Sequence, residues 1–471
     1  MEPFADRREF LRRAGNGCGM LAVTCLLQEQ GKLRAQSRNP LAPHAGHFAP
    51  KARAVIWLHM HGAPSSIDLY TPKPALDRHH GKPMNLGSNV GFFRDTGTVM
   101  RSPFRFARHG QCGAWFSEVL PNIARHADDI AFLKGMHVLS NNHGPALYEI
   151  NTGLTRVGFP SVGSWVTYGL GSENQNLPGY VIMPDPRGSI EGGPFSWSSG
   201  FLPGAFQGTP IRTGANPILH VRPLANVGID RQRAQLDLAA ALNRLHSERS
   251  PDEGDLLSRI ESFELAYRMQ MEAPEALDIS RETPATHRLY GIDNPVSQPY
   301  GSQVLLARRL IERGVRFVQI YSGPQNDNDR WDAHANLNRN HRQRGLETDV
   351  AVAGLLTDLK QRGLFDSTLV IWAGEFGRLP ICQGETIDGR DHNRFGFALW
   401  MAGAGIKGGA SFGATDDLGL HAVEGRTTVH DLHATILHLL GMDHERLTYH
   451  HAGRDYRLTD VSGRVVNEIL A

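Results

Sequence analysis

Short runs of apolar, often β-branched residues alternate along the chain with longer segments of helical periodicity. The runs at 52–60, 130–134, 315–321 and 366–373 predict strands. Helices are expected at the segments listed next: 120–125, 161–171, 303–314, 347–362 and 434–440. Strands that alternate with helices indicate an α/β fold, with a mostly parallel central sheet and helices on both faces.

The stretch at about 185–300 breaks this alternation. Residues 188–208 are rich in glycine, proline and aromatic residues, and we expect them to line or cover a site. Residues 231–271 have an amphipathic, charged helical pattern that predicts a helical layer rather than catalytic machinery. We therefore treat 37–471 as one domain with an irregular and helical insertion at about 185–300.

The N-terminus carries an export signal. The sequence Asp6-Arg-Arg-Glu-Phe-Leu-Arg12 is a twin-arginine pattern, and the weakly hydrophobic segment after it, 14–27, is too short to cross a bilayer. We expect residues 1–36 to be a signal peptide read by the twin-arginine translocase. The mature chain would then be periplasmic or extracellular and without a transmembrane anchor.

The composition bears on binding partners and on a possible disulfide bond. The formal net charge is +1, which gives no indication of a nucleic-acid or anionic-membrane partner. Beyond the signal peptide the cysteines are Cys112 and Cys382, too few for a disulfide scaffold. Whether these two pair is left open by the sequence.

Acidic and imidazole side chains follow the predicted strands. Glu375 comes at the tip of the strand 366–373, and Asp391 and His392 lie in a glycine-bounded loop shortly after it. In α/β folds the carboxyl ends of the strands are where ligands and metals bind. This combination is typical of metal or general acid–base chemistry.

Four further residues are of the same types. His61 directly follows the first strand, and His143 stands just before a helix whose first turn contains a proline. Asp332 and His334 form an Asp-x-His pair. In a loop, both side chains of such a pair can reach one ligand, whereas on a helix they point apart.

These motifs resemble the exported sulfatase-like family DUF1501, of the alkaline phosphatase and sulfatase superfamily. The matching segments are His61-Gly-Ala-Pro-Ser, His143-Gly-Pro-Ala, Pro160-Ser-Val-Gly-Ser-Trp165, Trp331-Asp-Ala-His334, Glu375-Phe-Gly-Arg378, Gly389-Arg-Asp-His392, Gly413-Ala-Thr-Asp416 and Asp431–Gly441. The resemblance runs from the twin-arginine signal to about Arg446 and implies an alkaline phosphatase-like fold.

The chain differs from active sulfatases at the positions of the catalytic residues. By the spacing to Thr152-Gly153, His143 occupies the place of the sulfatase nucleophile, and Leu147 stands where that motif has an arginine. The Cys or Ser that matures to formylglycine is thus absent, which argues against conventional sulfatase chemistry.

Two functions are consistent with the resemblance. In the first, the chain is a metal-dependent hydrolase of sulfate or phosphate esters, including sulfated polysaccharide. A mixed nitrogen and oxygen donor set suits zinc, manganese or iron more than calcium. The implied metal ligands are His61, His143, Asp332, His334, Glu375, Asp391 and His392.

His143 would then be a ligand, or a nucleophile that passes through a phosphohistidine. Arg378 or Lys134 would hold the ester's anionic oxygens. In the second function hydrolysis has been lost, and the chain binds an anion or polysaccharide at the cell surface through the remaining cleft. A serine hydrolase is disfavoured because no Gly-x-Ser-x-Gly elbow occurs. Asp431 is interpreted as the N-cap of the helix 434–440.

Overall fold

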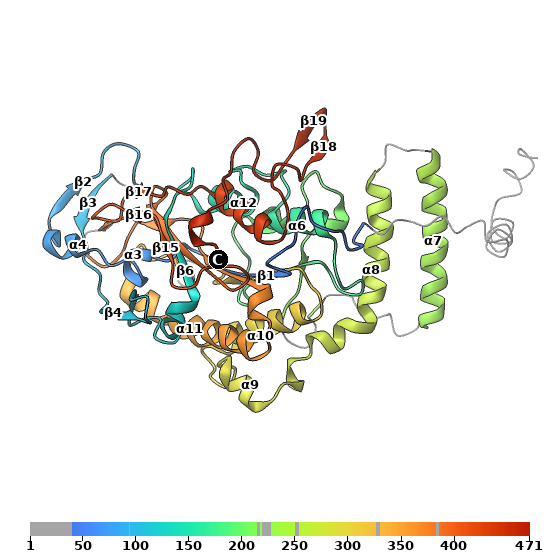
Figure 1. Ribbon diagram of the computed structural model, residues 1–471, viewed down its shortest axis with the longest axis horizontal. Coiled ribbons are helices and arrows are strands. Elements are labelled where there is room, and N and C mark those ends of the chain that lie inside the picture. The colour runs from blue at the N-terminus through green and yellow to red at the C-terminus, as the bar shows by residue number, and fades with distance from the viewer. Residues whose placement is uncertain are drawn as a thin grey trace, which may run out of the picture.

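A computed structural model describes residues 40–93, 95–213, 217–218, 228–249, 254–325, 330–382 and 386–471 (Figure 1). The predicted signal peptide, 1–36, lies outside these residues. The same holds for its cleavage site and its twin-arginine motif.

An eight-stranded sheet forms the centre of the molecule. Its order is β15-β6-β14-β10-β1-β9-β7-β8. The strands are β1 (Ala54–Met60), β6 (Ile130–Met136), β7 (Tyr180–Met183), β8 (Thr209–Pro210), β9 (Phe317–Ser322), β10 (Thr368–Ala373), β14 (Phe397–Ala402) and β15 (Ser411–Phe412). β1 pairs in parallel with β9 and β10, and β7 pairs in parallel with β8 and β9. The predicted α/β fold with a mostly parallel sheet is confirmed.

One strand of this sheet runs against the others. β14 pairs antiparallel with both β10 and β6, so β6 itself runs parallel to β10 and β1. The carboxyl ends of β1, β6, β9 and β10 therefore lie at the same edge of the sheet. The loops that leave these four ends carry the candidate site.

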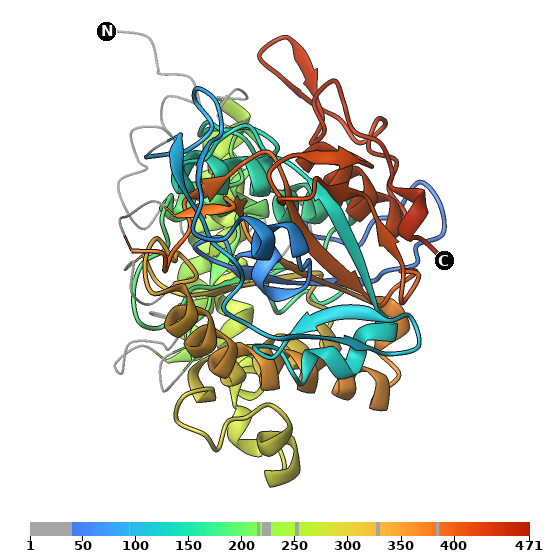
Figure 2. The ribbon, with the colours of Figure 1, turned by 90° about the vertical axis from the view of Figure 1, so that its left-hand side faces the viewer.

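Helices cover both faces of the sheet (Figures 1 and 2). α10 (Gln298–Glu312) and α11 (Leu337–Gln361) pack on one face, and α5 (His143–Thr152), α6 (Val162–Leu170) and α12 (Val429–Leu439) cover the other. Successive side chains of a strand point to opposite faces. In β1, accordingly, Ile56 and Leu58 join one core cluster, while Val55 and Trp57 join the other. A sheet buried on both sides explains why the predicted strands are almost continuously apolar.

The segment between β7 and α10 is irregular and helical. It consists of η2 (Gly193–Trp197), η3 (Gly204–Phe206), β8, α7 (Ile229–Arg249), α8 (Gly254–Leu277), η4 (Ile279–Arg281) and α9 (Pro284–Leu289). The helical layer predicted at 231–271 consists of two helices, α7 and α8, which lie side by side at one end of the molecule (Figure 1).

Short elements make up the rest. The helical ones are α3 (Ser66–Leu69), α4 (Pro74–His79), η1 (Ile123–Asp129), η5 (Phe365–Ser367) and η6 (Asn467–Ile469). The strands of the small sheets are β2 (Pro83–Asn85), β3 (Thr96–Val99), β4 (Phe106–His109), β5 (Ala114–Ser117), β11 (Gly377–Arg378), β12 (Ile381–Cys382), β13 (His392–Asn393), β16 (Ala414–Thr415), β17 (Ala422–Glu424), β18 (Tyr449–His451) and β19 (Arg454–Tyr456).

Two local predictions need correction. The helix expected at 120–125 is the 3-10 helix η1, which is kinked at His126. The N-cap of α12 is Thr428 rather than Asp431. Thr428 accepts a hydrogen bond from the amide of Asp431, and the Asp431 carboxylate accepts one from the amide of Thr428, which makes a capping box. Both residue types cap helices, and only backbone geometry distinguishes them.

The structure also bears on membrane-spanning helices and on the state of the two cysteines. Among the described helices, none combines the length and apolar character needed to span a bilayer. Cys112 is exposed, Cys382 is buried, and both are free thiols.

Buried His433 on α12 makes stability depend on pH. Its Nε2 lies 3.0 Å from the carbonyl oxygen of Ile150, and burial lowers its pKa to about 3. In the unfolded chain an ordinary histidine has a pKa of about 6.5. Between these values the unfolded state binds the proton and the folded state does not, so stability is complete above about pH 6.5 and falls as the pH is lowered towards 3.

We expect this histidine to cost the protein about 2 to 3 kcal/mol of stability between pH 6.5 and 4.5. Thermal unfolding of the wild type and a His433→Gln variant at both pH values checks this, because glutamine can still donate to Ile150 but does not titrate. The wild type should lose more stability on acidification than the variant; equal losses would contradict the assignment.

Candidate functional site

The loops after four parallel strands bring the candidate residues together. His61 directly follows β1, and Glu375 comes two residues after β10. Asp332 and His334 lie in the loop between β9 and α11, so the pair has the loop conformation expected. His143 is the first residue of α5, whose N-cap Asn142 accepts a hydrogen bond from the amide of Gly144.

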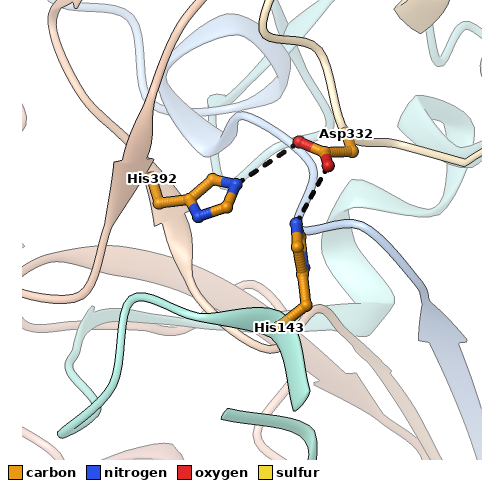
Figure 3. Close-up of side chains that lie close together, drawn as sticks. All are labelled: His143, Asp332 and His392. Atoms are coloured by element: carbon orange, nitrogen blue, oxygen red, sulfur yellow. Dashed lines mark hydrogen bonds and ion pairs between the residues drawn. The ribbon is translucent and has the colours of Figure 1, made fainter. Parts of the chain in front are cut away.

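The Asp332 carboxylate is the centre of the site, and three histidines surround it. Its Oδ2 lies 3.0 Å from His143 Nε2. Its Oδ1 lies 3.0 Å from His334 Nε2 and 3.5 Å from His392 Nε2. Figure 3 shows His143 and His392 reaching the two oxygens of Asp332 from different segments.

Two arginines donate to the same carboxylate. Arg378 Nη2 donates to Asp332 Oδ1 at 2.6 Å, and Arg330 Nη2 donates to Oδ2 at 2.8 Å. Burial alone would raise the pKa of Asp332, but Arg378 and the hydrogen bonds to His143 and His334 lower it far below its ordinary value. Asp332 is therefore a permanent anion.

His143 lies between two carboxylates. Its Nδ1 is 2.6 Å from Glu375 Oε1, while its Nε2 faces Asp332. Glu375 is fully buried, accepts a hydrogen bond from the amide of Gly62 at 2.9 Å, and lies 3.3 Å from His59 Nε2. Burial alone would lower the pKa of His143, but the bonds to Asp332 and Glu375 raise it above its ordinary value. Without a metal, His143 therefore carries a proton on each nitrogen; a metal cation would replace the one on Nε2.

His392 has a different arrangement. Its Nδ1 lies 2.6 Å from the carbonyl oxygen of Asn141, and because a carbonyl only accepts, Nδ1 carries the proton. Burial lowers the pKa of His392 to about 3, so the ring is neutral and Nε2 holds a lone pair. That lone pair faces the anionic Oδ1 of Asp332 at 3.5 Å without a hydrogen bond. Two electron donors face each other here, as they do around a cation.

His61 repeats this arrangement. Its Nδ1 is 3.0 Å from the carbonyl oxygen of Gly323, and burial lowers its pKa to about 4. Its buried Nε2 has no hydrogen-bond partner among the described residues. A histidine that donates one ring N–H to a backbone carbonyl and leaves the other nitrogen bare has the usual form of a metal ligand.

Among the residues that the structure describes, two groups of donor atoms are compact enough to hold an ion. His143, Asp332 and His392 form one group, and His334, Asp391 and His392 form the other, with the ligand atoms of each within 4.8 Å of one another. Two ligand atoms that each lie about 2.1 Å from one zinc ion, at a near-tetrahedral angle, are roughly 3 to 3.5 Å apart. The contacts of Asp332 with His143 and His392, at 3.0 and 3.5 Å, have this spacing.

The donors fit a transition metal better than calcium. The first group offers two imidazoles and one carboxylate, which suit zinc, manganese or iron, whereas calcium prefers oxygen donors alone. Five of the seven residues proposed as ligands fall within the two groups. Glu375 and His61 lie outside them: Glu375 contacts His143, and the centroid of the His61 ring is 6.4 Å from that of His143.

The two cations expected to hold ester oxygens lie in different environments. Arg378 is fully buried and donates to the carbonyl oxygens of Gly62, Ala63 and Arg390 as well as to Asp332. Binding of an ester by Arg378 would require it to exchange one of these contacts. Lys134 is on β6 with its ammonium 5.4 Å from the ring of Phe132, and burial lowers its pKa.

Sequence reasoning missed two members of the site. His59 on β1 contacts Glu375, and Arg330 joins Asp332 to Glu191 through ion pairs of 2.8 and 2.6 Å. His59 precedes His61 by two positions, and residues two apart in a strand share a face. That spacing was the available signal for His59, whereas nothing in the sequence singles out Arg330.

Solved structures with a similar chain trace include sulfatases and phosphatases. The lipoteichoic acid synthase LtaP from Listeria monocytogenes is 9% identical, with 92% of this chain and 80% of that chain covered and a TM-score of 0.35. The PsFucS1 sulfatase from Pseudoalteromonas sp. is 13% identical, with 83% and 68% covered and a TM-score of 0.34. The alkaline phosphatase from the Antarctic bacterium TAB5 is 12% identical, with 75% and 92% covered and a TM-score of 0.33. Likeness at this level carries no argument about activity.

Sequence comparison adds one positive finding. No curated protein sequence matches the chain. The family described as "Protein of unknown function (DUF1501)" matches residues 52–470, nearly the whole described part, and the chain therefore belongs to this family, as its motifs predicted.

Proposed function

We propose that this protein is a metal-dependent hydrolase of phosphate or sulfate esters. The observation that carries the proposal is the meeting of the neutral His392 Nε2 with the anionic Asp332 Oδ1, without a hydrogen bond between them. Arg378 already donates to this oxygen, but no described residue donates to the His392 lone pair, which is therefore available to a metal ion. Around it are further imidazole and carboxylate donors at the carboxyl edge of a parallel sheet.

Each residue has a distinct part in this proposal. We assign His143, Asp332 and His392 to the ion, with His334 and Asp391 next to it. When bound, the ion would polarise an ester oxygen and lower the pKa of a water molecule.

Glu375 fixes the orientation of His143 through Nδ1, which leaves only Nε2 for the ion. Because each nitrogen of His143 faces a carboxylate, we assign His143 as a ligand rather than as a nucleophile.

An ester can reach the site from one side. The side chains of His143, Asp332 and His392 are at most 5% exposed, whereas that of His334 is 26% exposed. We therefore place the approach of the substrate beside His334. The anionic group of the ester, free or carried by a sulfated polysaccharide, would then meet the positive charge of the ion.

We further propose that the protein is exported already folded. The twin-arginine pattern at 6–12 supports transport by the twin-arginine translocase to the periplasm or the cell exterior. A folded, metal-loaded protein is the cargo that this route accepts.

Ester hydrolysis by metal-loaded protein tests the proposed function. The mature protein, stripped and then loaded with zinc, manganese or iron, is assayed with 4-nitrophenyl phosphate, bis(4-nitrophenyl) phosphate and 4-nitrophenyl sulfate. We expect hydrolysis of at least one ester that depends on the metal. It should fall to the rate of buffer alone in a His143→Ala, His392→Ala double variant.

The non-catalytic function predicts another outcome of the same experiment. If protein with stoichiometric metal hydrolyses none of the esters but retains a sulfated polysaccharide on a column, the chain is an anion-binding protein of the cell surface. That result would overturn the hydrolase proposal.

A further inference from the structure

A short loop beside the site has an unusually fixed backbone. The carboxylate of Asp95 accepts hydrogen bonds from the amides of residues 89–91, at 2.7 to 2.9 Å. Asp391 Oδ2 accepts the next two, from Phe92 at 3.0 Å and Phe93 at 2.9 Å. Five successive amides are thus held by two carboxylates, and one of these belongs to the second donor group of the site.

This loop places two phenylalanine rings against the candidate ligands. The centroid of the Phe92 ring is 5.0 Å from that of His392, and the centroid of the Phe93 ring is 5.2 Å from that of His334, edge to face. The two phenylalanine rings are 4.7 Å apart and mutually perpendicular. They form one continuous apolar surface next to the donors.

The same rings face the solvent. Phe92 is 39% exposed and Phe93 is 56% exposed. Single exposed apolar side chains are ordinary on protein surfaces, so one of them would carry no argument. Here the backbone of two adjacent rings is held by the buried carboxylate of Asp391, on the side where His334 is exposed, which is a costly arrangement for a surface without a ligand.

We propose that Phe92 and Phe93 form a binding platform for a ring in the alcohol part of the ester substrate. The ring would be an aryl group or a sugar ring that packs its apolar face on the phenylalanines while the anionic group reaches the metal. The platform carries no charge of its own, so it distinguishes substrates by their organic part. Aromatic faces bind such rings in tilted or stacked contacts. This inference rests on the proposed function.

Binding of three phosphonates tests the platform without turnover. Methylphosphonate has the anionic group alone, phenylphosphonate adds an aryl ring, and C-glucosyl methylphosphonate adds a sugar ring. Affinities are measured by calorimetry on metal-loaded protein. We expect at least one ring-bearing ligand to bind about tenfold more tightly than methylphosphonate, and Phe93→Ala to remove that advantage. The ring-bearing ligand that binds more tightly than methylphosphonate identifies the kind of ring.

Matched variants separate recognition from a general effect of losing an exposed ring. Phe263 on α8 is 59% exposed and Phe48 is 41% exposed, close to the values for Phe93 and Phe92. Phe263→Ala and Phe48→Ala should keep the advantage of the ring-bearing ligand. Phe93→Tyr should also keep it, and all variants should retain the metal and the affinity for methylphosphonate.

Two failures remain distinguishable. If methylphosphonate does not bind to the metal-loaded wild type, the proposed function fails, and the platform with it. If methylphosphonate binds but neither ring adds affinity, or if Phe93→Ala keeps the advantage, the platform is overturned and the proposed function stands.

Discussion

Replacing Asp332 by asparagine removes the metal and destabilises the fold, because this one carboxylate faces three imidazoles and two guanidinium groups. Asparagine keeps the shape but not the charge. It leaves the guanidinium of Arg378, which is fully buried, without its anion. Breaking a buried ion pair from one side costs about 3 to 5 kcal/mol. We expect Asp332→Asn to lose metal binding and this amount of unfolding free energy, measured by elemental analysis and by denaturant unfolding.

Asp349→Asn is the matched control for that variant. Asp349 is also buried, but it accepts hydrogen bonds from the amides of Asn122 and Ile123 and belongs to neither donor group. Its replacement should cost about 1 to 3 kcal/mol, as loss of buried hydrogen bonds does, and should leave the metal content unchanged. An Asp332→Asn protein that still holds as much metal as the wild type would contradict the central place of Asp332.

The second large effect is expected at His392, which is common to both donor groups. Its ring is held by the Asn141 carbonyl, so Nε2 cannot turn away from Asp332 without losing a partly buried hydrogen bond. Mutations of residues that merely orient metal ligands cost 10- to 100-fold in affinity. We expect His392→Ala, which removes a ligand itself, to weaken metal binding by more than about 100-fold.

His433→Gln provides the comparison for His392→Ala. Both histidines are buried and neutral, and each bonds a backbone carbonyl through one nitrogen. Only His392 belongs to a donor group. A titration with a fluorescent zinc chelator should therefore give wild-type affinity for His433→Gln and a large loss for His392→Ala; equal affinities in the two would remove His392 from the site.

Much of the fold followed from local patterns. The strands 52–60, 130–134, 315–321 and 366–373 correspond to β1, β6, β9 and β10 to within a few residues. Their continuous apolar character reports burial on both faces, which is a local property of each strand. Parallel strands then place their following loops at one edge, so the convergence of these loops could be expected as well.

Properties set by contacts between distant segments could not be read in the same way. The antiparallel strand β14 enters between β10 and β6, a matter of pairing rather than of local composition. α11 begins at Leu337, ten residues before the predicted start, because its first turns bury Leu337 and His341 among charged neighbours. The charged residues hid the helical periodicity.

In the site, too, some features followed from local sequence and others depended on contacts between distant segments. The residue types at the strand ends indicated metal chemistry, but not the central position of Asp332 or the tautomer of His392, which depends on the Asn141 carbonyl. Arg378 was expected to face an ester; four of its contacts are with protein groups, a fact that only the packed structure reveals. The aromatic pair Phe92 and Phe93 has no motif at all, since its meaning comes from contact with His392 and His334.

The most direct test is elemental analysis by mass spectrometry. The mature protein is purified without chelators, beside the His143→Ala, His392→Ala double variant. We expect stoichiometric zinc, manganese or iron in the wild type and none in the folded variant. Absence of metal from both proteins, with folding unchanged, would contradict the metal centre and the hydrolase that depends on it.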